Sequence, residues 1–73
     1  MQTNLYSVFD NKSGVFCKPF VSINDATAIR DFAHAAASPS TEISRFPNDF
    51  CLYRLASFQD VTGVITPEPT LVS

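Results

Sequence analysis

The two glycines of this chain each end a short polar segment that lies between two apolar runs. Gly14 ends the segment 10–14 (DNKSG), Gly63 ends the segment 59–63 (QDVTG), and each glycine stands five residues after a Phe. Glycine adopts a positive φ angle without steric cost, so such segments predict tight turns that join antiparallel strands. Hairpin turns of this length favour the same residue types, which accounts for the similarity of the two segments. The alternative is an internal duplication. Either way, the sequence predicts two β-hairpins, one near each end of the chain.

The runs beside these turns are rich in strand-forming residues. Residues 5–10 (LYSVFD) and 15–21 (VFCKPFV) are the strands of the first predicted hairpin. Pro19 has no N–H group, which indicates that the second of these strands lies at a sheet edge or carries a bulge. Residues 50–58 (FCLYRLASF) place apolar side chains on both alternating faces, as a central strand does. Residues 64–66 are the second strand of the second predicted hairpin, and this strand is expected to end at the prolines that follow it.

Between the two hairpins the apolar residues follow a helical period. They recur three and four positions apart, at Ala26, Ile29, Phe32, Ala33 and Ala36. This spacing predicts an amphipathic helix over 25–37, capped by Ser22, Asn24 or Asp25 and ended by Pro39. The segment after the helix, at 38–49, is expected to be a crossing loop that contains a short helical turn near 42–45.

These elements define an α+β fold class with the order ββαββ, in which two hairpins form an antiparallel sheet with one helix packed on one face. With 73 residues the chain has room for one domain. The domain is expected to span 1–67, with 68–73 as a C-terminal tail. One slim helix covers only one side of such a sheet, so we expect an uncovered face and look for function there.

Residues suited to catalysis or metal binding are scarce. Cys17 and Cys51 lie 34 positions apart and His34 is the single histidine, so the chain lacks the close Cys/His pairs of structural zinc sites. The cysteines are expected to be reduced and buried in strands, with a disulfide as the alternative, and His34 to face solvent. We therefore expect no catalytic residues, no metal and no cofactor, with self-association as the extra stabiliser of a small core. No apolar run approaches the roughly 20 residues of a membrane span, so no membrane contact is expected.

The charge balance disfavours binding to nucleic acid, whereas the aromatic residues favour binding to single strands. Five Lys and Arg oppose seven Asp and Glu, and the resulting net charge of −2 does not draw the protein to phosphate. Binding of single strands nevertheless needs only a few cations and aromatic faces on which bases stack. The candidate nucleic-acid-binding residues are Tyr6, Lys18, Tyr53 and Arg54 on strands and Lys12 and Arg45 on loops. The alternative is that the strand aromatics, Phe16 included, belong to the core or to a dimer interface.

Several short motifs also occur in a fixed order along most of the chain. They are Tyr6-Ser7-Val8-Phe9-Asp10-x-Lys12, Pro19-Phe20, Ala28-Ile29-Arg30-x-Phe32, Phe46-Pro47-x-Asp49-Phe50-x-Leu52-Tyr53 and Phe58-x-x-x-Thr62-Gly63. Over residues 5–67 this pattern resembles the small non-structural protein of gokushovirus-like microviruses, which are phages with circular single-stranded DNA genomes. The chain departs from the pattern at Gln59, where an acidic residue often directly follows the Phe, and in its short, proline-interrupted C-terminus.

The resemblance implies a phage accessory protein that acts in single-stranded genome replication or packaging, in the cytoplasm of the infected bacterial host. It brings no established catalytic residues, so the candidate residues rest on the physical interpretation alone. Two hypotheses follow. In the first, an aromatic and basic sheet surface contacts single-stranded DNA. In the second, the protein is a homodimeric interaction module that engages a phage or host replication protein without touching DNA.

Overall fold

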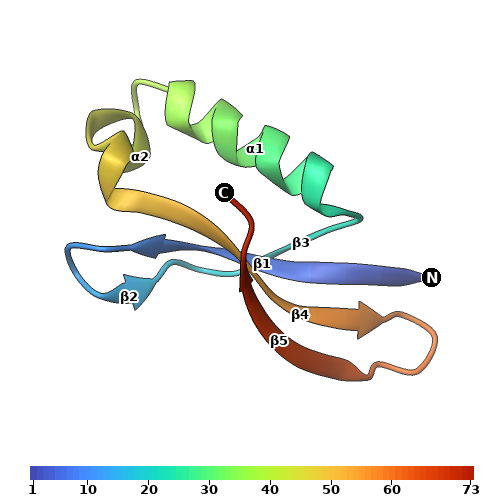
Figure 1. Ribbon diagram of the computed structural model, residues 1–73. Helices are drawn as coiled ribbons and strands as arrows, with labels where there is room; N and C mark the ends of the chain where they lie inside the picture. The colour runs from blue at the N-terminus through green and yellow to red at the C-terminus, as the bar shows by residue number, and fades with distance from the viewer.

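The computed structural model describes residues 1–73 and contains one antiparallel sheet with a helix on one side (Figure 1). In chain order the elements are β1 (Gln2–Asp10), β2 (Val15–Phe16), β3 (Phe20–Ser22), α1 (Asp25–Ala37), α2 (Glu42–Arg45), the 3-10 helix η1 (Pro47–Asp49), β4 (Phe50–Gln59) and β5 (Ile65–Leu71). The strand order is β2-β1-β4-β5, and β3 also pairs with β1. The predicted α+β class is therefore confirmed, and so is the central place of the strand that begins at Phe50.

Both glycine-closed turns are present. Gly14 has a φ angle of 73° and Gly63 one of 76°. The Gly14 N–H donates to the Asp10 carbonyl at 2.8 Å, and the Gly63 N–H donates to the Gln59 carbonyl at 2.7 Å. The same hydrogen bond thus closes both turns, as the shared spacing of the two segments predicts.

The prediction of one continuous strand over 15–21 is wrong. The structure has two short strands, β2 and β3, separated by Cys17, Lys18 and Pro19. Pro19 cannot donate to a strand ladder, so pairing with β1 breaks there and resumes at Phe20. Both short strands lie at the sheet edge, as Pro19 indicates.

The predicted stop of the last strand is also wrong. Strand β5 runs through Pro67 and Pro69 to Leu71. It is an edge strand that pairs only with β4, and the pairing shifts register between Arg54 and Ala56, so the prolines cost few ladder hydrogen bonds. Beyond it the Leu52 N–H donates to the Ser73 carbonyl at 2.7 Å. Residues 68–73, expected as a tail, therefore complete the sheet.

Helix α1 has the predicted bounds because local signals define both of its ends. The Asn24 side chain accepts the Thr27 N–H at 2.8 Å, which makes Asn24 the N-cap. Ser38, which precedes Pro39, is extended and ends the helix. The short helical turn predicted near 42–45 is also confirmed, as α2. Neither helix has the length and hydropathy needed to cross a membrane.

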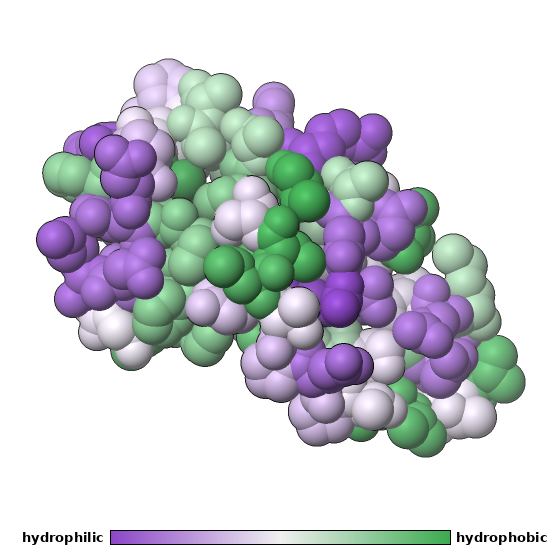
Figure 2. All heavy atoms as spheres, in the orientation of Figure 1, coloured by the Kyte–Doolittle hydropathy of each residue, from purple (hydrophilic) through white to green (hydrophobic).

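The core lies between α1 and one face of the sheet. It consists of Tyr6, Val8, Ala28 and Leu52, with Phe20, Phe32, Ile43, Phe50 and Val72 packed against it. On the side seen in Figure 2, hydrophobic residues gather below α1 and across the middle of the molecule, and hydrophilic residues surround the end near α2. Only 7 of the 73 residues are buried, so the core is small. Both α1 and α2 lie on the same side of the sheet, and no helix lies on the opposite face (Figure 1).

Candidate functional site: the uncovered face of the sheet

Strand alternation and pairing register define the face that α1 does not cover. Tyr6 and Val8 belong to the core under α1, so Leu5, Ser7 and Phe9 of β1 point to the other side. Directly paired residues share a face, which assigns the neighbouring strands. One end of this face, the aromatic end, consists of Ser7, Phe9, Phe16, Cys51, Tyr53 and Leu71. The other, the aliphatic end, consists of Leu5, Val21, Ala56, Phe58, Ile65 and Pro67.

The aromatic end is built around three rings from three strands. Phe16 lies opposite Phe9 in the register, with their ring centroids 4.8 Å apart. The ring of Tyr53 stands edge-on to both, 5.4 Å from Phe16 and 6.1 Å from Phe9. Such tilted contacts stabilise aromatic clusters, yet 45% of Phe16 remains exposed. The cluster therefore holds aromatic surface in a fixed position against solvent.

Two exposed lysines flank this cluster in the chain. Lys12 lies in the turn between β1 and β2, and Lys18 is the second residue after β2. Asp10 also belongs to the turn, and its carboxylate accepts the Lys12 N–H at 2.9 Å. This hydrogen bond lowers the pKa of Asp10, so the carboxylate stays charged. Lys12 also lines a pocket with Asp10, Glu42 and Asp49, so of these two lysines only Lys18 lies outside that acidic pocket.

Tyr6 and Arg54, two of the predicted nucleic-acid contacts, lie on the covered side instead. Tyr6 is 0% exposed, and its hydroxyl donates to Asp25 Oδ1 at 2.6 Å. The Arg54 guanidinium donates to Asp25 Oδ2, also at 2.6 Å, and Asn4 donates to the Tyr6 hydroxyl at 3.1 Å. These bonds join both central strands to the first turn of α1, where the helix dipole favours a carboxylate. Tyr6 is therefore closed to a nucleic-acid base, and the charge of Arg54 is already paired.

The network changes the pKa of each of its members. The hydrogen bonds from Tyr6 and then from Arg54 hold the pKa of Asp25 below its ordinary value of 3.8. Burial and then the bond to Asp25 raise the pKa of Tyr6 above 10.0, and Asp25 raises the pKa of Arg54. At neutral pH the group thus holds one carboxylate, one guanidinium and one neutral phenol, which suits a structural anchor.

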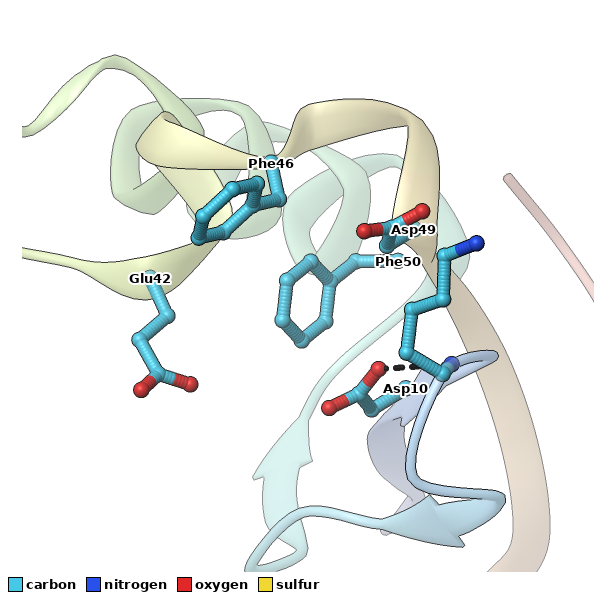
Figure 3. A pocket seen from close by; sticks show the side chains of 6 residues that line it. Asp10, Glu42, Phe46, Asp49 and Phe50 are labelled. Carbon is cyan, nitrogen blue, oxygen red and sulfur yellow. Dashed lines mark hydrogen bonds between the residues drawn. The ribbon is translucent and has the colours of Figure 1, made fainter.

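Arg45 also lies away from the uncovered face. It belongs to α2, whose Ile43 packs against the core on the side of α1. The pocket beside it has a volume of about 320 Å³, and its lining residues are Asp10, Lys12, Glu42, Phe46, Asp49 and Phe50 (Figure 3). Three carboxylates against one ammonium make this pocket unsuited to phosphate.

The two cysteines are free. Cys17 is exposed, contrary to the expectation of a buried thiol, because the chain leaves the ladder between β2 and β3. The buried Ser7 hydroxyl donates to the Cys17 carbonyl at 2.6 Å and fixes this segment. Cys51 is half-buried opposite Phe9. No group of three or more His, Cys, Asp or Glu side chains is arranged to hold a metal ion.

The structure therefore divides the six predicted candidates into two sets. Tyr53 and Lys18 lie at or beside the aromatic end, whereas Tyr6, Arg45 and Arg54 lie on the side of the helices, and Lys12 lines the acidic pocket there. The candidates left out Phe9 and Phe16, which the turn at Gly14 could have revealed. A hairpin closed at this glycine pairs Phe9 with Phe16 and so brings both rings to one face.

Comparison with known proteins gives one match. The model of a family described as phage ORF5 protein matches residues 3–73, nearly the whole chain. No curated protein matches the chain, and no solved structure does.

Proposed function

Because the chain belongs to the phage ORF5 protein family, we propose that this phage accessory protein binds single-stranded DNA during genome replication or packaging. The resemblance of its motifs to gokushovirus-like microvirus proteins supports a circular single-stranded genome as the setting. The proposed role also requires the cytoplasm of the infected bacterium, where such a genome is copied.

The observation that carries the proposal is the ring pair Phe16 and Tyr53 on a sheet face that no helix covers. Bases stack on aromatic side chains irrespective of sequence, at about 1–3 kcal/mol for each base. Rings held by mutual contacts lose little freedom when a base stacks on them, so the cluster is suited to this kind of contact.

The charges favour weak, salt-sensitive binding. Lys18 can neutralise a phosphate next to a base stacked at Phe16, while the net charge of −2 and the three carboxylates around Lys12 oppose tight association. For single strands each neutralised phosphate contributes about −0.7 to the slope of log K against log salt. One lysine therefore predicts a slope of about −0.7.

The test is fluorescence anisotropy of a labelled single-stranded oligothymidylate, measured at several salt concentrations. Lys18→Gln should lower the magnitude of the salt slope by about 0.7, and Phe16→Leu should weaken binding about tenfold while keeping an apolar side chain. Arg30→Gln is the matched control, because it removes the same charge from the exposed side of α1. The DNA proposal fails if the wild type gives no anisotropy change at low salt, or if the control loses as much binding as Lys18→Gln.

A second candidate function is a protein-interaction module that binds a phage or host replication protein without DNA. The observation that favours it is the exposed Leu71 opposite Tyr53, together with the apolar remainder of the same face. Apolar surface of this kind is typical of protein interfaces. In that case the wild type gives no anisotropy change at any salt concentration.

A further inference from the structure

The aliphatic end of the uncovered face has no assigned role in DNA contact. Val21 of β3 and Ile65 of β5 are 58% and 57% exposed, and they lie opposite Leu5 and Phe58 in the register. Between them Ala56 of β4 is buried and forms the floor of the patch. Side chains from four strands thus make one continuous apolar surface.

This end contains no charged side chain. The carboxylate of Asp60, in the β4–β5 turn, pairs with the N-terminal ammonium of Met1. Such a patch cannot select a partner through complementary charge. An uncharged apolar patch can, however, pack against the same patch of a second copy related by a twofold axis.

Both edges of the sheet are unsuited to strand addition. Pro67 and Pro69 lie in the edge strand β5, and Pro19 interrupts the opposite edge between β2 and β3. Prolines at edges prevent edge-to-edge pairing, so association must use a face.

We propose that two copies of this chain pack face to face through their aliphatic ends. The molecule measures 39 × 22 × 17 Å along its principal axes. A face of this size offers on the order of 800 Å² and its aliphatic end about half of that, which corresponds to a small, concentration-dependent interface. Because only 7 of 73 residues are buried in one copy, the added apolar burial supplies what the core lacks. The aromatic end stays free, so the dimer is compatible with the proposed DNA contact and with a partner protein that binds at Leu71 and Tyr53, but not with a partner that needs the aliphatic end.

The test is the mass in solution by sedimentation velocity over a wide range of protein concentration. The wild type should shift from the 8.0 kDa of one chain toward twice that mass as the concentration rises. Val21→Lys and Ile65→Lys should each stay at the mass of one chain, since a lysine ammonium resists burial in an apolar interface. Both positions are more than half exposed, so the fold should persist, which circular dichroism checks.

Val61→Lys is the matched control, because it makes the same change in the β4–β5 turn at a side chain that is 83% exposed. It should dimerise as the wild type does. The inference is overturned if the wild type stays at the mass of one chain at all concentrations, or if Val21→Lys and Ile65→Lys still dimerise. A wild-type dimer lost in these two variants, without any binding of oligothymidylate, would support the dimer and reject the DNA contact.

Discussion

Replacing Tyr6 by Phe tests the network that joins the sheet to α1. The change removes one buried hydroxyl, which donates to Asp25 at 2.6 Å, and leaves the ring in the core. A hydrogen bond to a charged group contributes about 1.5–3 kcal/mol to stability. The Asp25 side chain is 38% exposed and keeps its bond to Arg54, so the low end of this range applies, about 1.5 kcal/mol. For a domain of this size that loss lowers the melting temperature by about 6–12 °C.

The assay is urea denaturation followed by circular dichroism, with Tyr53→Phe as the control. Tyr53→Phe removes the same hydroxyl group from the aromatic end, where Tyr53 contacts Phe9 and Phe16 through its ring. Its free energy of unfolding should change by less than about 0.5 kcal/mol. If both variants lose the same stability, or if Tyr6→Phe loses none, the hydroxyl does not hold α1 to the sheet and this reasoning is refuted.

Three further predictions concern stability and reactivity. Asn24→Ala removes the N-cap of α1 and should cost about 1 kcal/mol in the same assay, and an unchanged unfolding midpoint would contradict the cap. Because the pKa of Asp25 is lowered, its stabilisation is present above pH 3.8 and is lost as the pH falls through the lowered value. The pKa of Tyr6 is raised, so its contribution is present below pH 10.0 and is lost as the pH rises through the raised value; urea midpoints of Tyr6→Phe should vary less than those of the wild type at both extremes. In the native protein Ellman's reagent should modify the exposed Cys17 quickly and the half-buried Cys51 slowly, and equal rates would contradict this difference in exposure.

The features that the sequence predicts well have local causes. The Asn24 cap and the restriction of Ser38 by Pro39 determine the bounds of α1 within a few residues of each end. Gly14 and Gly63 close their turns through hydrogen bonds that span five residues. Such signals act over short distances along the chain, so they can be found without knowledge of the fold.

The wrong predictions depend on contacts between distant parts of the chain. A proline stops a strand only where its N–H is needed by a partner, and Pro67 and Pro69 lie in a strand with one neighbour and a shifted register. Likewise, Tyr6 and Tyr53 are both strand aromatics in the sequence. The pairing of β1 with β4 and the docking of α1 decide that Tyr6 is buried and Tyr53 lies on the uncovered face.

We propose that the uncovered face of the sheet carries the function. Amide NMR of isotope-labelled protein during titration with single-stranded oligothymidylate tests this most directly. The largest shift changes should occur at Phe9, Phe16, Lys18 and Tyr53, with little change along α1. An unchanged spectrum, or changes centred on α1 or on the pocket at α2, would contradict it.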